Sequence, residues 1–314
     1  MKVVALAGGV GGAKLVHGLA MLLPPEELSV IVNTGDDFEY LGLNISPDLD
    51  TVCYTLADLA NPVTGWGRKD ESWGAFQEIA NLAGPDWFHL GDKDLGTHIL
   101  RTYRLSQGFK LSEITAEFCQ SWGVNYPVFP MSDHSVRTVV HTDQGEALGF
   151  QEYFVHQACA PVVQRFEFVG IDVAKPLPQA LDAINACDVV IISPSNPWVS
   201  IDPILKVSGY SDAVRKKPVV AVSPLIGGRA VKGPAAKMVE ELGLKPSAAA
   251  VAKHYQDILT GFVFDIQDRQ ELEKIERWRI ITLVTDILMK NNQDRFRLAE
   301  EVLRFCGTIL NRSR

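Results

Sequence analysis

The chain has 314 residues, with 30 Lys and Arg against 38 Asp and Glu, so its formal net charge is −8. This length allows two domains or one large α/β domain with an insertion, and 46% hydrophobic against 22% charged residues excludes a disordered chain. The acidic balance excludes a nucleic-acid-binding surface, which needs a basic footprint. An anionic ligand must therefore be held locally, by backbone amides, a few placed cations or a metal ion.

The five cysteines are scattered, odd in number and without a C-x-x-C pair. This pattern is typical of reduced, mostly buried thiols in a cytosolic protein. The apolar N-terminus contains four glycines and is interrupted by Lys14 and His17, which argues against a signal peptide. No stretch approaches the ~20 apolar residues of a membrane span. We therefore expect a soluble cytoplasmic protein with neither a membrane nor a nucleic acid as partner.

The first 35 residues predict a strand, a glycine-rich turn, a helix and a second strand. Residues 3–7 are a continuous apolar run, typical of a strand that is buried on both faces, and residues 28–32 are predicted as a second buried strand. Between them, glycines at positions 8, 9, 11 and 12 precede a helical pattern that ends at Pro24. Such a unit is a right-handed crossover, which builds a parallel sheet. We therefore predict an α/β fold, a Rossmann-like three-layer arrangement around a parallel sheet.

Later segments repeat this alternation on either side of a middle portion with a different character. Residues 188–192 and 218–222 are predicted strands, preceded by predicted helices at 177–186 and 204–216. In the middle portion, predicted helices occupy 71–83, 95–106 and 111–122, and residues 124–170 alternate like strands around a hairpin signal at 142–145. A closing amphipathic helix is predicted at 294–310.

The predicted organisation is a core with an insertion. Residues 1–51 and 171–314 would form the Rossmann-like nucleotide-binding core. Residues 52–170 would form a mainly helical subdomain with a β-hairpin region that covers one side of the sheet. In open α/β sheets the ligand crevice lies at the carboxyl ends of the strands, so the segments after the predicted strands are where functional residues are expected.

The first glycine-rich turn is predicted to bind phosphate. Glycines let the backbone approach an anion closely, and the following helix presents N–H groups and a positive dipole end. The candidate nucleotide-binding residues are Gly9, Gly11, Gly12 and Lys14. A Walker A motif is excluded because Leu15 stands where Ser or Thr is needed, and Lys14 breaks the dinucleotide-binding fingerprint. The alternative is an ordinary tight turn between a strand and a helix.

Four aspartates follow the second predicted strand, at positions 36, 37, 48 and 50. Four carboxylates near a phosphate-binding turn would repel an anion unless a divalent cation lies between them. Mg²⁺ typically bridges one or two carboxylates and the phosphates of a substrate. A carboxylate could also accept a hydroxyl proton or orient a nucleophile. The alternative for Asp48 and Ser46 is that one of them caps the next helix.

Two further strand ends carry candidate ligand-binding residues. Ser195 and Asn196 follow the predicted strand at 188–192, and Asn196 is fixed between two prolines. Their neutral donors suit a base edge or a phosphate oxygen, although an Asx-type turn is the alternative for Asn196. Gly227 and Gly228 follow the strand at 218–222 and favour close contact with a ligand.

Residues 87–101 contain both aromatic and polar side chains. Trp87 and Phe88 would pack in a core or stack on a flat ring system. His89 alone would more often be a surface or core histidine. His98 and Arg101 share one helix face with Asp94, which could be merely a salt-bridged face. The seven histidines form no zinc pattern, and there is no nucleophile elbow.

Seven segments, in order and with similar spacing over almost the whole chain, resemble the CofD family. These are the 2-phospho-L-lactate transferases of coenzyme F420 biosynthesis, called FbiA in some bacteria. The matching segments are 8–14, 33–37, 47–51, 90–94 with Thr97 and His98, 130–133, 193–197 and 223–228. The glycine-rich turn alone would be weak evidence, whereas seven motifs in register are specific.

The resemblance implies a transferase for substituted phosphate groups. It would move a phospholactyl or phosphoenolpyruvyl group from a GDP-linked donor, lactyl-diphosphoguanosine or its enolpyruvyl equivalent, to the ribityl hydroxyl of the deazaflavin Fo. GMP leaves, a phosphodiester forms and Mg²⁺ is required. The resemblance also implies a homodimer that acts on these small molecules, with the inserted subdomain covering the deazaflavin.

The resemblance also implies roles for single residues. The aspartate of the family's Pro-Asp-Leu-Asp-Thr motif contacts Fo, and here it is Asp50. A second contact falls at His89, where Lys or Arg is common in the family, so this chain departs from the pattern there. We expect Asp50 to position the Fo hydroxyl or to share the metal. The complete assignment is Asp50, Thr51, Trp87 and His89 for Fo, Asp36, Asp37 and Asp50 for Mg²⁺, and the same three aspartates for catalysis.

Two other classes of function are compatible with parts of the sequence. The gluconeogenesis-factor or YvcK-like proteins share the fold and bind nucleotide-sugars without known transfer chemistry, but their second-strand loop is typically rich in Gly and Ser rather than Thr-Gly-Asp-Asp. An NAD-dependent oxidoreductase would also have acidic residues after its second strand, and Lys14 argues against it. Lactyl, enolpyruvyl and glyceryl donors differ by a hydroxyl or a double bond, so all three stay open.

Overall fold

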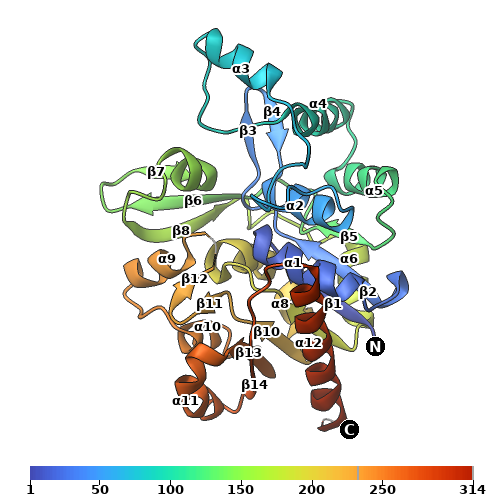
Figure 1. Ribbon diagram of the computed structural model, residues 1–314, viewed down its shortest axis with the longest axis vertical. Coiled ribbons are helices and arrows are strands. Elements are labelled where there is room, and N and C mark those ends of the chain that lie inside the picture. Colours follow the sequence, from blue (N-terminus) through green and yellow to red (C-terminus); the bar gives the residue numbers. More distant parts are fainter. Residues whose placement is uncertain (232, 313–314) are drawn as a thin grey trace.

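The computed structural model describes residues 1–231 and 233–312. Within them, the centre of the molecule is a seven-stranded sheet with the order β14-β13-β10-β9-β1-β2-β5 (Figure 1). Every neighbouring pair is parallel, so the carboxyl ends of all seven strands lie along one edge. The strands are β1 (Val3–Ala7), β2 (Leu28–Val32), β5 (Val128–Pro130), β9 (Val189–Ile192), β10 (Val219–Val222), β13 (Gly261–Asp265) and β14 (Ile281–Thr285).

The chain reverses its direction of winding at β1. This strand pairs with β2 on one side, where Val3 is opposite Leu28, and with β9 on the other, where Val3 is opposite Val189. The chain first winds outward through β2 and β5 and then starts again at β9. Ligands of doubly wound sheets bind outside the carboxyl ends of the strands at such a reversal. The turns after β1 and β9 are therefore the expected place for a site.

Helices cover both faces of this sheet, which explains why its strands are mostly apolar. Along β1, Ala5 and Ala7 contact one buried cluster, whereas Val4 and Leu6 contact the other. One face is covered by α1 (Gly9–Ala20), α2 (Pro47–Leu56), α5 (Leu111–Ser121) and α12 (Asn292–Arg312). The other is covered by α6 (Pro178–Ala186), α7 (Asp202–Lys206), α8 (Tyr210–Val214), α10 (Ala248–His254) and α11 (Leu272–Glu276). The predicted three-layer Rossmann-like fold is confirmed.

Smaller elements extend beyond these layers. The hairpin of β3 (Phe38–Tyr40) and β4 (Leu43–Ile45) projects at the top of Figure 1 beside α3 (Gly74–Asn81) and α4 (Asp92–Ser106). An antiparallel sheet lies to the left, made by β6 (Arg137–Thr142), β7 (Ala147–Gly149) and β8 (Val163–Val169). The remaining elements are the hairpin β11 (Leu225–Ile226) and β12 (Arg229–Ala230), α9 (Ala235–Glu241), and the short segments η1 (Pro25–Glu27), η2 (Glu152–His156), η3 (Pro197–Ile201) and η4 (Ile266–Glu271).

The predicted insertion at 52–170 crosses the observed layers. β5 falls inside this range, yet it is the edge strand of the main sheet beside β2. It has only three residues, and Pro130 ends it, so no long apolar run marks it in the sequence. The rest of the range is helical and then antiparallel, as expected, and the predicted hairpin turn joins β6 to β7. The division into domains stays a prediction.

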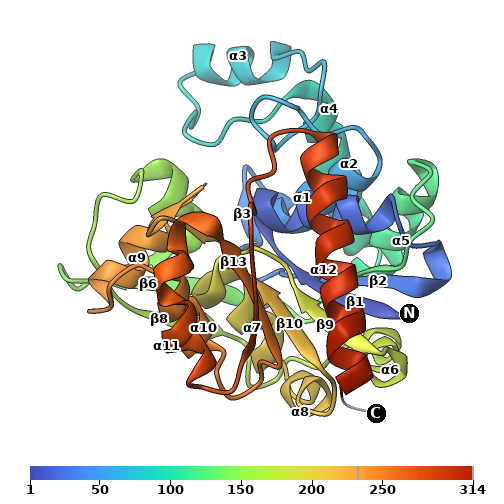
Figure 2. The same cartoon turned by 60° about the horizontal axis from the view of Figure 1, so that its bottom comes forward.

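Two predicted helices are wrong in extent. The helix expected over 204–216 is divided into α7 and α8, because Gly209 between them takes φ +91, outside the helical range. The first helix ends at Ala20, and Pro25 begins η1 instead of directly stopping α1. The closing helix is present as α12, and it lies beside α1 in both views (Figures 1 and 2).

The five cysteines are free thiols, and four of them are buried. None of the helices formed by residues 1–231 and 233–312 combines the length and the apolar character that a membrane span requires.

Candidate active site

A cavity of about 500 Å³ opens where the winding of the sheet reverses. Gly8, Pro194 and Ser223, which line it, follow β1, β9 and β10 respectively. Its size suits a nucleotide-sized ligand, since small-molecule sites typically span roughly 300–1,000 Å³.

The glycines predicted as a loop form the first turn of α1. The helix begins at Gly9, whose φ of +62 favours glycine. A Cβ at Gly11 would lie 2.4 Å from the carbonyl oxygen of Pro194, so only glycine lets the helix start approach the turn after β9 so closely. Gly9 and Gly11 line the cavity. The N-terminal end of a helix, where an anion is favoured, therefore borders the cavity.

Ser195 and Asn196 line the cavity but also hold the backbone around it. The Ser195 hydroxyl donates to the carbonyl oxygen of Gly8 at 2.7 Å and lies 3.0 Å from the Gly8 N–H, which joins the turns after β1 and β9. Asn196 Oδ1 accepts the Trp198 N–H at 3.1 Å and caps η3. The turn role considered for Asn196 from the sequence is thus present.

Of the other predicted nucleotide-binding residues, only Lys14 lines the cavity. Lys14 lines the cavity, and its Nζ donates to the carbonyl oxygen of Met289 at 2.7 Å. Gly12 packs against Ser195 and is absent from the cavity lining. Gly227 and Gly228 form the turn of the β11–β12 hairpin, with φ of +58 and +72, and also lie outside the lining. The structure therefore brings Gly9, Gly11, Lys14, Ser195 and Asn196 together around the cavity.

Asp36 and Asp48 are buried carboxylates in the cavity lining. Burial raises the pKa of Asp48 to about 6 and that of Asp36 well above its ordinary value, and the charge of Asp48 raises the pKa of Asp36 further. Asn33 Nδ2 donates to Asp48 Oδ2 at 2.9 Å, whereas Asp36 Oδ1 is buried without a hydrogen-bond partner. Carboxylates in these surroundings suit a divalent cation, because a cation removes the cost of burying their charge.

Asp37 lies outside the cavity lining, unlike Asp36. Its Oδ2 accepts the Ser46 hydroxyl at 2.7 Å, and burial raises its pKa to about 7. Ser46 precedes α2 but makes no capping bond to it, so the capping role considered for Ser46 is absent.

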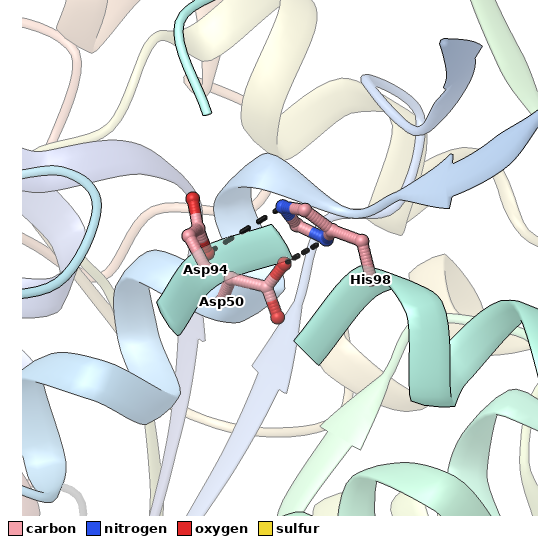
Figure 3. A group of neighbouring side chains, drawn as sticks. All are labelled: Asp50, Asp94 and His98. Atoms are coloured by element: carbon pink, nitrogen blue, oxygen red, sulfur yellow. Dashed lines mark ion pairs between the residues drawn. The ribbon is translucent and has the colours of Figure 1, made fainter. Parts of the chain in front are cut away.

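The three predicted metal ligands do not form a group whose donor atoms all lie within 4.8 Å of one another, so their binding of Mg²⁺ stays a prediction. Among the residues that the structure describes, the only group of three potential ligand side chains with donor atoms within 4.8 Å of one another is Asp50, Asp94 and His98 (Figure 3). This trio shares only Asp50 with the predicted set of Asp36, Asp37 and Asp50.

Asp50 belongs to a network between α2 and α4. Arg101 Nη2 forms a buried ion pair with Asp50 Oδ1, and Arg101 Nη1 lies 3.1 Å from His98 Nδ1. His98 Nδ1 lies 3.7 Å from Asp50 Oδ2, and His98 Nε2 lies 3.4 Å from Asp94 Oδ1 (Figure 3). The Tyr54 hydroxyl is 2.8 Å from Asp94 Oδ1. Of these five residues, Asp50, Tyr54, Asp94 and His98 line the cavity, whereas Arg101 lies outside the lining.

Part of the cavity lining is aromatic. Trp87 stacks on His156 of η2, with ring centroids 5.1 Å apart and an angle of 24°. Phe150 and Phe154 stack on each other at 5.6 Å. The β3–β4 hairpin supports this part through Tyr40, whose ring meets Trp87 edge to face at 5.1 Å. These surfaces can receive a flat ring system by stacking.

Thr51 and His89 also line the cavity. Thr51 is buried beside Asp50 on α2. His89 is exposed, and its ring lies 4.8 Å from that of Phe76 on α3. All four predicted Fo-binding residues therefore border one cavity, and their contacts with Fo stay a prediction.

Sequence reasoning missed several parts of the lining. Thr64, Trp66 and Gly67 come from the segment between α2 and α3, Phe150, Phe154 and Val155 come from the end of β7 and from η2, and Ile287 to Met289 come from the segment between β14 and α12. None of them follows a strand that was predicted for the main sheet, so the position of the strand ends could not have marked them. The Asp94, His98 and Arg101 face was visible from its helical spacing, but not its pairing with Asp50.

The chain matches known proteins over nearly its full length. The model of the family described as 2-phospho-L-lactate transferase CofD matches residues 3–298. The chain is 42% identical to a phosphoenolpyruvate transferase of Streptomyces griseus, covering 96% of this chain and 99% of the relative. It is 40% identical to a 2-phospho-L-lactate transferase of Methanopyrus kandleri, covering 99% of each.

The fold also resembles a solved structure. A crystal structure of a UPF0052 family protein from Bacillus halodurans superposes with a TM-score of 0.62 at 18% identity, covering 96% of this chain and 98% of that one. At this identity the likeness concerns the fold alone.

Proposed function

The chain belongs to the CofD family of 2-phospho-L-lactate transferases, and from this premise we propose that it transfers a phospholactyl or phosphoenolpyruvyl group from a GDP-linked donor to the deazaflavin Fo in coenzyme F420 biosynthesis. One observation carries the proposal. A single cavity combines a helix N-terminus, the buried carboxylates of Asp36 and Asp48, and aromatic side chains. A diphosphate requires the first two, and a flat acceptor ring suits the third.

The donor diphosphate would bind at the start of α1. Backbone amides around Gly9 and Gly11 and the dipole of the helix favour negative charge there. Ser195 and Asn196 border the same space on the side of β9, and Lys14 adds a cation. The net charge of −8 makes such local binding necessary, because the protein as a whole repels an anion.

Asp36 and Asp48 would hold Mg²⁺. Asp36 Oδ1 is buried without a hydrogen-bond partner, and both carboxylates line the cavity beside the turn after β1. They fit the ion better than the pair of Asp37 and Asp50, because Asp37 lies outside the lining and Arg101 already neutralises Asp50. When bound, the ion would offset the charge of the diphosphate and of the departing GMP.

The acceptor would bind with its ring beside the aromatic lining and its hydroxyl near Asp50. Trp87 and Phe154 offer ring faces, and Thr51 and His89 add polar groups. The acceptor oxygen attacks the phosphorus that carries the three-carbon acid, the bond from this phosphorus to the oxygen of GMP breaks, and the hydroxyl proton is released. Asp50 would align the hydroxyl by accepting its hydrogen bond, so that positioning and charge neutralisation supply most of the catalysis.

The two alternative functions receive less support. The relatives named above are transferases at 40% identity or more, whereas the likeness to the UPF0052 protein concerns the fold alone. The cytoplasmic location and the homodimer stay predictions.

Incubation of the purified chain with Fo, Mg²⁺ and either the lactyl or the enolpyruvyl donor tests the proposal. Mass spectrometry should detect the phosphodiester of Fo and one GMP for each product formed, and the preferred donor identifies the three-carbon acid. Absence of product with every donor, from protein that is folded and binds GDP, would contradict the transferase proposal.

Asp50→Asn should lower the rate of product formation at least about 100-fold. A neutral amide accepts a hydrogen bond from the acceptor hydroxyl more weakly than the negatively charged carboxylate does. Asp58→Asn is the matched control. Asp58 follows α2, its side chain is 77% exposed, and its positive φ of 55 is one that asparagine tolerates. This control should keep the wild-type rate.

A further inference from the structure

Helix α4 buries its polar face and exposes an apolar one. Asp94, Thr97, His98 and Arg101 follow helical spacing and are all buried, with Arg101 only 2% exposed. On the outer side, Ile99, Leu100 and Tyr103 are 44% to 57% exposed. This is the reverse of the ordinary pattern for a surface helix. A buried arginine is costly, and apolar residues would join α4 to α2 at least as well, so the inward polar face calls for another explanation.

One hydrogen bond of this face sets how His98 and Arg101 interact. Arginine can only donate, so His98 Nδ1, which lies 3.1 Å from Arg101 Nη1, acts as acceptor. His98 Nε2 lies 3.4 Å from Asp94 Oδ1 and is buried without a hydrogen-bond partner. With Nδ1 accepting from Arg101, His98 donates nothing to Asp50.

As a result, only one of the two carboxylate oxygens of Asp50 has a partner. Oδ1 pairs with Arg101, and Oδ2 is buried without a hydrogen-bond partner, although His98 Nδ1 lies 3.7 Å away. The planar guanidinium spans the two neighbours, one nitrogen on Asp50 and one on His98. This fork holds Oδ1 in place and leaves Oδ2 without a partner at a residue that lines the cavity.

We infer that Arg101 is the positioning residue of this active site, acting without touching the substrate by holding Asp50 through one carboxylate oxygen while the other stays without a partner, as the acceptor for the substrate hydroxyl. His98 Nδ1 and the Asn44 carbonyl oxygen hold the guanidinium in turn, at 3.1 and 3.3 Å from Nη1. The inference rests on the proposed transferase function, since it names what orients Asp50. Arg101 lies outside the cavity lining, so its loss should leave the donor site intact.

Arg101→Lys and Arg101→Met test this role. Lysine keeps the charge but cannot donate to Asp50 and His98 through a planar fork, so kcat should fall about tenfold. Methionine removes the charge, and kcat should fall about 100-fold, the scale expected when a reacting group is misplaced by ~1 Å. The dissociation constant of GDP with Mg²⁺, measured by titration calorimetry without Fo, should stay within about twofold of the wild type for both variants.

The matched control is Arg104→Met on the same helix. Arg104 pairs with Glu117 at 3.3 Å, and its side chain is 35% exposed. This control should keep the wild-type kcat. A double-variant cycle adds a second readout: once Asp50 is asparagine, adding Arg101→Met should lower kcat by less than about threefold, because both changes remove the same interaction.

Two results would overturn the inference. One is a wild-type kcat in Arg101→Lys. The other is a loss of GDP binding that parallels the loss of kcat in both Arg101 variants, since Arg101 would then merely support the fold. If Arg101→Met does not fold, Arg101→Lys alone decides between these outcomes. Failure of the wild-type chain to form product would refute the proposed function instead, so the two failures are distinguishable.

Discussion

At the scale of single residues, the buried aspartates beside the glycine turn make stability depend on pH. In the unfolded chain an aspartate loses its proton near 3.8, whereas in the folded chain burial raises the pKa of Asp48 to about 6 and that of Asp37 to about 7. Between these values the folded state binds more protons than the unfolded state. The free energy of unfolding therefore falls as the pH rises through this range.

We expect Mg²⁺ to oppose this loss. The melting temperature of the metal-free chain should fall between about pH 5 and about pH 8, and added Mg²⁺ should raise it more at the higher pH, because a cation binds the deprotonated carboxylates. Differential scanning calorimetry at the two pH values, with and without Mg²⁺, measures both effects.

Asp48→Asn is the informative variant for this experiment. It removes one of the two proposed ligands and its titration, while the amide can still pair with Asn33. The variant should show a flatter pH profile and a smaller response to Mg²⁺. An unchanged response to Mg²⁺ in Asp48→Asn would show that the ion binds elsewhere.

The polar face of α4 could be predicted from the sequence only in part. The helical spacing of Asp94, His98 and Arg101 predicts that they share one face of a helix. It also allows a salt-bridged face in solvent, because charged stripes on helices are usually solvated. Their burial depends on how α4 is rotated against α2. The partner of Arg101 is 51 residues away in the sequence, so local spacing cannot identify it. Asp50 itself was identified by resemblance; it lies in the cavity lining, and its role there stays a prediction.

At the scale of elements, the start of α1 should tolerate little added volume. Gly11→Ala would place a Cβ 2.4 Å from the Pro194 carbonyl oxygen, so the helix and the turn after β9 must separate. We expect a stability loss of about 1–3 kcal/mol, as for other overpacked sites. We also expect the dissociation constant of GDP to rise about tenfold or more, since this turn borders the nucleotide end of the cavity. Chemical denaturation and titration calorimetry measure the two quantities.

Gly18→Ala is the matched control on the same helix. Its Cβ would lie 2.2 Å from the carbonyl oxygen of Arg295 on α12, away from the cavity lining. This variant should lose comparable stability but bind GDP like the wild type once folded. Equal losses of GDP affinity in both variants would show that Gly11 matters only for the fold.

The elements that sequence reasoning found are those with long, uniform patterns. β1, β2, β9 and β10 are runs of β-branched and other apolar residues that are buried on both faces, and α12 has a long amphipathic repeat. β5 lies in a range that was predicted to be strand-like, but its place in the main sheet was missed, because that place depends on pairing with β2 rather than on its own three residues. The break at Gly209 was missed because an isolated glycine is tolerated in many helices.

At the scale of the whole molecule, the cavity is built from segments that are distant in the sequence. Its lining includes the start of α1, the aspartates after β2, the aromatic residues before α4, η2, the turn after β9 and the segment before α12. A ligand that contacts several of these segments should therefore stabilise the complete fold rather than one part of it.

Hydrogen exchange should separate the two proposed ends of this cavity. GDP with Mg²⁺ should slow exchange mainly in residues 8–14 and 193–200, which surround the start of α1, whereas Fo should slow it mainly in residues 87–98 and 150–156, which carry the aromatic lining. Exchange detected by mass spectrometry resolves these segments because local opening is protected where a ligand binds. Residues 111–121 in α5 lie outside the lining and should change little with either ligand. If both ligands protected the same segments, donor and acceptor would compete for one position, and direct transfer between them in this cavity would be excluded.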